Sequence, residues 1–202
     1  MKNKILRIVK KAIIVVAIIW FILVLIGAGR KWYFDKTDSQ IARIHNTKLS
    51  IDDVMGKNLP PDPGVEADKT IEGIDANENG IRDDVELAIF KEYPNSAKTR
   101  MPLLQYALSL QLQMTLSFIT TETFTETVAD THSRAQVCLW TLSSRDDMEK
   151  FNKETEEYEA FVDDLQLNNE KRKKYLEDIY EKMRSFSSSN DGCDIDSVTL
   201  PN

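Results

Sequence analysis

The hydrophobic positions of the chain begin with a single unbroken apolar run near the N-terminus. Residues 12–28 (AIIVVAIIWFILVLIGA) contain no charged residue and no proline. With Gly29 this run would form a helix of roughly 27 Å, which is close to the ~30 Å hydrocarbon thickness of a bilayer. We therefore predict a transmembrane helix over residues 12–29.

Apolar residues recur at helical spacing further along the chain. In residues 148–165 and 169–186 they alternate between steps of three and four, which predicts two amphipathic helices. Residues 83–93 (DDVELAIFKEY) predict another helix, which ends before a proline. Ser144 with Asp147 resembles a capping box for the helix near residue 148, and Asn168 or Asn169 can cap the next one.

Residues 108–118 give an ambiguous signal. Leucine, methionine and phenylalanine alternate there with serine, glutamine and threonine, as they would in a strand. Most of these residues are nevertheless good helix formers, and no partner strand is evident elsewhere in the sequence. We favour a central helix packed from two opposed sides, with a strand as the alternative, and we expect an all-α fold.

The charges beside the apolar run predict its orientation. Five Lys or Arg residues precede the run, whereas Arg30, Lys31 and Lys36 follow it. The positive-inside rule then places the N-terminus in the cytoplasm and the bulk of the chain outside the inner or plasma membrane, in the periplasm or at the cell surface. A cleaved signal peptide is the alternative, although its apolar part usually spans only about 7–15 residues.

Composition divides the chain into five parts. We expect a cytoplasmic basic tail (1–11), a membrane anchor (12–29), a stalk or linker (30–64), a calcium loop with a small helical bundle (65–186) and a serine-rich C-terminal tail (187–202). The stalk ends in the proline-rich sequence NLPPDPG, which cannot be the interior of a helix.

Residues 75–86 (DANENGIRDDVE) fit the calcium-loop pattern D-x-[DN]-x-[DN]-G-x5-E at every specified position. Calcium prefers about six to eight hard oxygen ligands, which this pattern supplies from side chains and one backbone carbonyl. Gly80 allows the sharp bend in the middle of the loop because it has no Cβ. The expected ligands are Asp75, Asn77, Asn79, the Ile81 carbonyl, Asp83 directly or through water, and both oxygens of Glu86.

This stretch resembles the EF-hand-like loops of bacterial secreted and surface proteins, in which D-x-N-x-N-G-[IV]-x-D-D-x-E recurs. The resemblance covers about a dozen residues, so it implies a Ca²⁺ ligand set and not an activity. Arg82 replaces the β-branched residue of paired EF-hands, and the sequence has no second loop, which argues against a calmodulin-like switch. The alternative is an Asn- and Gly-rich turn before an acidic helix N-terminus, with Asp83 and Asp84 interacting with the helix dipole.

Cys138 and Cys193 are the only two cysteines of the chain. An oxidising compartment favours a disulfide between them, which would tie the serine-rich tail to the residues around 137–140. Two separate buried thiols are the alternative. His132 lies six residues before Cys138, so on a helix the two side chains point in different directions and cannot form a nucleophile pair.

The uneven charge distribution limits the class of partner. Residues 1–34 carry a net charge of +7. Because the whole chain carries −7, the remainder carries −14. Such an acidic domain is a poor partner for nucleic acid. The sequence also lacks the G-x-S-x-G and H-E-x-x-H motifs and a phosphate-binding glycine loop, and it indicates no small-molecule substrate.

We therefore expect a non-enzymatic, membrane-anchored envelope protein whose helical domain binds calcium and presents a surface to a protein partner. Two alternatives remain open. One is an envelope enzyme whose carboxylates converge only in three dimensions, and the other is a secreted calcium-dependent structural module released by signal cleavage.

Overall fold

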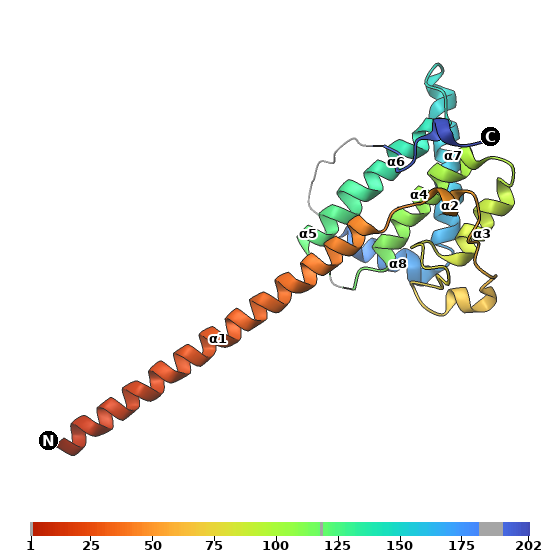
Figure 1. Cartoon of the computed structure of the whole chain (residues 1–202). Coiled ribbons are helices and arrows are strands. Elements are labelled where there is room, and N and C mark those ends of the chain that lie inside the picture. The colour runs from red at the N-terminus through yellow and green to blue at the C-terminus, as the bar shows by residue number, and fades with distance from the viewer. Residues whose placement is uncertain (1, 118, 182–191) are drawn as a thin grey trace. The chain divides into compact units, whose positions relative to one another are not determined.

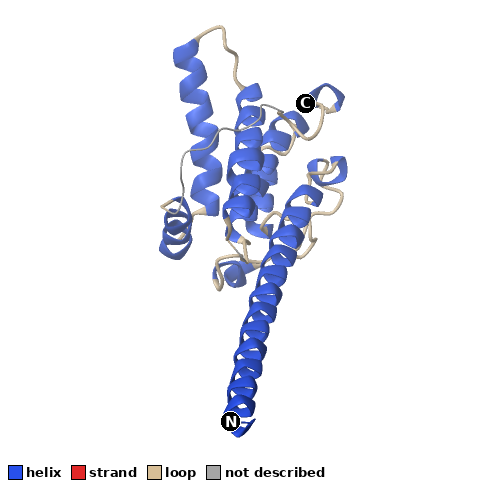
Figure 2. Cartoon of the chain, turned by 90° about the vertical axis from the view of Figure 1, so that its left-hand side faces the viewer, coloured by secondary structure: helices blue, strands red, loops and turns tan. Residues whose placement is uncertain are grey.

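A computed structural model describes residues 2–117, 119–181 and 192–202, and in these residues the chain consists of helices, turns and loops (Figure 2). No strand occurs in the described ranges, so the expected all-helical class is confirmed. The α-helices are α1 (Lys2–Asn46), α2 (Ile51–Val54), α3 (Asp83–Glu92), α4 (Ala97–Met114), α5 (Thr121–Phe124), α6 (Ser133–Leu139), α7 (Met148–Gln166) and α8 (Glu170–Tyr180). The other helical segments are the 3-10 turns η1 (Gly64–Asp68), η3 (Trp140–Leu142) and η4 (Ser197–Thr199) and the π-helical segment η2 (Thr125–His132).

Helix α1 contains the apolar run and continues beyond it. Its large apolar side chains between residues 5 and 26 are all exposed. By its length and composition α1 is a possible membrane anchor or signal sequence. The chain divides into two compact units, Met1–Gln40 and Ile41–Asn202, and the following paragraphs describe the second unit.

The stalk expected over residues 30–64 is not confirmed. Residues 30–46 continue α1, and a short connection leads from it to α2. Ile44, Leu49 and Val54 are buried in the core of the second unit. Their spacing follows neither a helical nor a strand period, because they belong to the end of one helix, a connection and a second helix. The folded unit therefore begins at Ile41 and not at residue 65.

Helix α4 lies among the other helices of this unit (Figure 1). It contacts α2, α3, α6, α7 and α8, and every one of its residues from 100 to 114 is buried. A helix covered on all sides has no need of a polar face, which explains why the sequence alternates without a helical period. The preferred helix is confirmed up to Met114, the strand alternative is wrong for these residues, and residue 118 lies outside the described residues.

The two predicted amphipathic helices correspond to α7 and α8, although residues 182–186 of the second prediction lie outside the described residues. Asp147 itself caps α7 by accepting the backbone N–H groups of the two residues at 149 and 150. Ser144 instead donates to Asp146, so the predicted capping box is wrong. Asn169 caps α8 by accepting the N–H of Arg172 at 3.1 Å.

The expected disulfide is confirmed, since Cys138 of α6 is bonded to Cys193. The residues beside Cys193 pack on the helices rather than forming a free tail. The Asp194 N–H donates to Gln105 Oε1 of α4 at 2.8 Å, and Ile195 is buried in the core. The described part of the predicted tail is therefore a component of the folded unit.

Replacing both cysteines with alanine is expected to lower the free energy of unfolding by about 4 kcal/mol, because the disulfide closes a loop with a sequence separation of 55 residues. Urea denaturation of the full chain in detergent, with and without reductant, measures this effect. Reductant should destabilise the wild type and leave the double variant unchanged. Equal stabilities of oxidised wild type and variant would contradict the expectation.

Candidate functional site

Residues 75–86 form a turn that leads directly into α3. Asp75 accepts the backbone N–H of Asn79 on Oδ1 at 3.1 Å and that of Gly80 on Oδ2 at 2.9 Å. Asn79 Oδ1 in turn accepts the N–H of Ile81 at 2.8 Å. Gly80 has a φ of +87°, a conformation that a residue without Cβ adopts at little cost. Side-chain oxygens of the predicted ligands therefore shape the loop through Asx-type turns.

The remaining predicted ligands close the loop from the side of α3. Asp83, the first residue of α3, accepts the Ala76 N–H at 3.0 Å. Glu86 Oε2, one turn further along, accepts a hydrogen bond from Asn77 Nδ2 at 3.0 Å. The Ile81 side chain is fully buried in the core, which fixes the backbone between these residues. Each of the five expected ligand side chains therefore makes a hydrogen bond within this one loop.

Burial raises the pKa of the three carboxyl groups among the expected ligands. Glu86 is 1% exposed, and its pKa is raised to about 7, mainly by loss of hydration and further by the negative charges of Asp53 and Asp83. The pKa values of Asp75 and Asp83 are also raised, mainly by burial, while backbone N–H groups oppose the shift. The loop therefore holds negative charge where water stabilises it poorly.

No cationic side chain within the described residues forms an ion pair with these three carboxyl groups. The buried Nδ2 of Asn79 lies close enough to Glu86 to lower its pKa, but it makes no hydrogen bond of good geometry in the described ranges. Buried charge of one sign is unfavourable until an opposite charge joins it. A cation bound here would supply that charge, so the residues fit one.

Oxygen ligands predominate in this donor set, which suits a hard ion such as Ca²⁺. In the part of the chain that the structure describes, no group of three or more His, Cys, Asp or Glu side chains is placed to hold a metal ion by itself. Asn77, Asn79 and the Ile81 carbonyl would therefore have to complete the shell around the carboxylates.

Arg82, the residue that departs from paired EF-hands, points away from the candidate ligands. Its fully buried guanidinium donates to the carbonyl oxygens of Leu165 at 2.6 Å and Gln166 at 3.1 Å, at the C-terminus of α7. Asp84 accepts two further hydrogen bonds from it. A cation at this end of α7 also interacts favourably with the helix dipole. Arg82 thus attaches the loop to α7, and Asp84 forms an ion pair with this arginine.

Arg172 of α8 holds the segment that precedes the loop. Its fully buried side chain donates to the carbonyl oxygens of Ala67 at 2.5 Å, Ile71 at 2.9 Å and Thr70 at 3.1 Å, and to Asp68 Oδ1 at 2.7 Å. Sequence reasoning missed this residue because it lies in the basic stretch 171–174, where nothing distinguishes it from exposed lysines.

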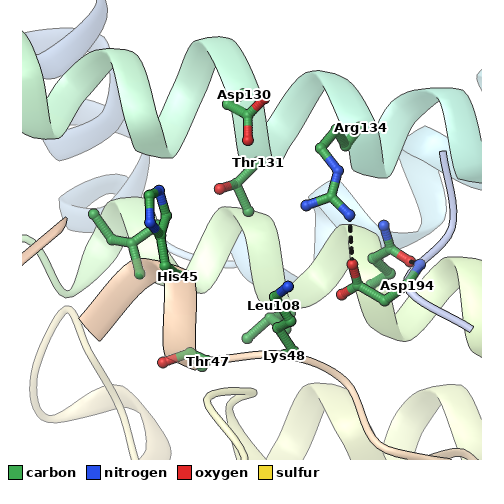
Figure 3. A pocket seen from close by; sticks show the side chains of 10 residues that line it. His45, Thr47, Lys48, Leu108, Asp130, Thr131, Arg134 and Asp194 are labelled. Carbon is green, nitrogen blue, oxygen red and sulfur yellow. Dashed lines mark hydrogen bonds and ion pairs between the residues drawn. The ribbon is translucent and has the colours of Figure 1, made fainter. Parts of the chain in front are cut away.

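A separate cavity of about 290 Å³ lies between the end of α1 and the segments η2 and α6 (Figure 3). His45 and Lys48 approach it from one side and Asp130 from the other, and an Arg134–Asp194 ion pair of 2.8 Å borders it. His45 is also bonded to a carboxylate of η2. Because the lining mixes both signs of charge, it favours neither an anion nor a cation, and we assign no ligand to it.

Several polar side chains lie near one another between α4, η2 and α7. His132 Nδ1 lies 3.0 Å from Ser109 Oγ, but the serine is fully buried, and burial lowers the pKa of His132 to about 4. Cys138 is in the disulfide, so it is not a nucleophile paired with this histidine. Asp163, whose pKa burial raises to about 6, accepts a hydrogen bond from Tyr106. The hydrogen bond of Asp163 joins α7 to α4 and involves no residue of the loop at residues 75–86.

Arg172→Lys is expected to lower the free energy of unfolding by about 3 kcal/mol, because an ammonium group cannot reproduce the fork of hydrogen bonds and leaves carbonyls unpaired. Chemical denaturation of the full chain in detergent measures the change. Lys173→Arg, at an exposed position of the same helix, is the matched control and should leave stability unchanged. A Lys variant as stable as the wild type would show that these contacts contribute little.

Glu86→Gln is expected to change how stability depends on pH in the calcium-free protein. The folded-state pKa of about 7 lies above the ordinary value of 4.5, so the folded state binds the proton more tightly than the unfolded chain does. The resulting stabilisation is fully present at a pH below the unfolded-state pKa of 4.5. It is lost as the pH rises through the folded-state pKa of about 7.

The stability of the wild type relative to the Gln variant should therefore fall by about 2–3 kcal/mol from pH 5 to pH 8. Urea titrations in a chelator across this range measure the difference, and taking it between the two proteins cancels the opposing titration of His132. A difference that stays constant with pH would contradict the burial of this charge.

Comparisons of the chain with protein-family models, with curated proteins and with solved structures found no significant match. The functional interpretation therefore depends on the residues and geometry of the chain itself, and these point most clearly to the loop at residues 75–86.

Proposed function

We propose that this chain is a membrane-anchored, extracytoplasmic helical protein that binds one calcium ion at residues 75–86 and acts as a structural or protein-interaction module rather than an enzyme. The observation that carries the proposal is that Asp75, Asp83 and Glu86 lie in one loop whose sequence matches the complete ligand pattern, where burial raises their pKa values and no cationic side chain among the described residues pairs with them.

Each ligand has a defined part in this proposal. Asp75, Asn77 and Asn79 supply oxygens from the turn, the Ile81 carbonyl supplies one from the backbone, and Asp83 and Glu86 supply oxygens from the first turn of α3. The ion neutralises the buried carboxylates and fixes the turn against the helix. Because Glu86 is the residue expected to bind through both oxygens, it contributes most to the affinity.

A solitary loop with three carboxylates suits the affinity range of extracellular modules, about 10⁻⁴–10⁻³ M. At ten times its dissociation constant, the ion adds only ~1.4 kcal/mol to stability. That magnitude is enough to order a segment and too small to reorganise a fold, which supports a clamp in preference to a signalling switch.

Three observations support an extracytoplasmic location with α1 as the anchor. The apolar side chains of α1 are exposed, as those of a helix in lipid would be. The larger number of basic residues precedes the apolar run, which favours a cytoplasmic N-terminus. The Cys138–Cys193 disulfide suits an oxidising compartment. A secreted form released by cleavage differs only in losing the anchor.

The calcium proposal is tested by titrating the full chain in detergent with calcium chloride and recording the heat of binding. We expect one site with a dissociation constant of about 10⁻⁴–10⁻³ M, and a loss of affinity of tenfold or more in Glu86→Gln. Glu92→Gln, at an exposed position of the same helix, should bind as the wild type does.

Absence of any calcium-dependent heat or thermal shift at millimolar ion in the wild type would overturn the proposed function. An equal loss of affinity in both glutamine variants would also contradict it, because that result would indicate a general effect of charge on α3 rather than a ligand at Glu86.

A further inference from the structure

A carboxylate from outside the loop lies beside the proposed calcium ligands. Asp53 belongs to the four-residue helix α2, and it is only 8% exposed. It lines a cavity of about 300 Å³ together with Asn77 and Asn79, two of the expected ligands. Lys48 also lines this cavity, but its side chain is exposed, so water screens its charge.

The hydrogen bonds of Asp53 leave one carboxylate oxygen available. Its Oδ2 accepts the Ser50 N–H at 2.9 Å and the Ser50 hydroxyl at 2.5 Å. Its Oδ1 accepts no hydrogen bond from the residues that the structure describes. A carboxylate oxygen without a donor, in a buried residue that borders a cavity, is available to a cation.

The fold holds this carboxylate in place. Val54, the next residue, is fully buried, and its carbonyl oxygen accepts hydrogen bonds from Arg100 Nε at 3.2 Å and Nη2 at 3.1 Å. Arg100 comes from the central helix α4 and is itself buried. The backbone beside Asp53 is therefore anchored to the core, and the hydrogen bonds from Ser50 hold its side chain.

Asp53 lies beside the loop, because Asn77 and Asn79 of the loop line the same cavity. Buried carboxylates that lie near one another repel and destabilise a fold in the absence of a cation. A divalent ion between them reverses the sign of the interaction, since each carboxylate then attracts the ion.

We propose that Asp53 is a fourth carboxylate of the calcium site, contributed by α2 from outside the loop. The inference rests on the proposed calcium site and adds a residue that the loop pattern does not contain. Extra ligand charge increases calcium affinity. With Asp53 the site therefore binds calcium more tightly than it would with the three ligand carboxylates of the loop alone.

The same residue links the ion to the chain that enters the folded unit. Asn77 Nδ2 donates to the Asn58 carbonyl at 2.9 Å, and a Cβ added to Gly80 would lie 2.6 Å from Thr47 Cγ2. The loop therefore packs against both ends of the segment that carries Asp53. An ion that binds Asp53 as well as the loop holds α2 and α3 together.

The test compares Asp53→Asn with Asp52→Asn in the full chain in detergent, titrated with calcium chloride. Asp52 is the matched control because it lies in the same helix, is exposed and forms a surface ion pair with Lys57. We expect Asp53→Asn to weaken calcium binding by about tenfold, as removal of a charged group near a metal does. Asp52→Asn should change the affinity less than about twofold, because water screens its charge.

Stability in a chelator provides a second measurement that separates a calcium role from helix capping. Asp53→Asn should be at least as stable as the wild type without calcium, because the variant removes repulsion. Ser50→Ala, which removes the capping hydroxyl and keeps the carboxylate, should lower stability and leave the dissociation constant unchanged.

Equal calcium affinities of Asp53→Asn and the wild type would overturn the inference and leave the proposed function intact. A loss of affinity in Ser50→Ala equal to that in Asp53→Asn would also overturn it, since capping alone would then explain both. Failure of the wild type to bind calcium would overturn the proposed calcium site itself. That outcome is distinct from the other two, in which the wild type binds calcium.

Discussion

The burial of α4 on every side is the constraint on which the rest of the second unit depends. A helix without a solvent face must pair each of its polar side chains inside the protein. Gln105 does so with the segment beside Cys193, Gln111 with the Glu72 carbonyl at 2.6 Å, and Ser109 with η2. The polar residues of the alternating stretch therefore fasten three peripheral segments to the core, while the leucines between them fill it.

The buried arginines likewise need hydrogen-bond partners inside the protein, because their charged groups have lost contact with water. Each guanidinium carries five N–H groups, and in a buried position it donates to several backbone carbonyls at helix ends and in the loops between helices. Arg172 gathers residues 67–71, Arg82 binds the end of α7, and Arg100 joins the ends of α2 and α3. The loop at residues 75–86 follows the segment that Arg172 holds on α8, and its own Arg82 attaches it to the end of α7.

Most of the fold could be predicted from local patterns, and the parts that could not depend on contacts distant in sequence. The helices near residues 83, 148 and 170 follow from periodicity, and the disulfide follows from the number and location of cysteines. Ile44, Leu49 and Val54 were assigned to a stalk because isolated apolar residues have no period that indicates a core. Arg172 and Asp53 were missed for a similar reason, since only the fold shows which member of a charged stretch is buried. The loop motif was visible because all of its ligands are local.

The fold changes the environment of the carboxyl groups in the loop at residues 75–86, and this change distinguishes the loop from an exposed turn. An exposed Asp- and Asn-rich turn would leave its carboxylates in water, where they would be stable with or without an ion. Here the surrounding segments bury Glu86 until its pKa reaches about 7, and Asp53 adds a negative charge from a second element. Folding without a cation therefore brings like charges together, and a divalent ion bound between them would reverse the sign of that interaction. In the proposed calcium site, the junction of α2 and α3 would therefore be the region of the fold whose order depends most on the ion.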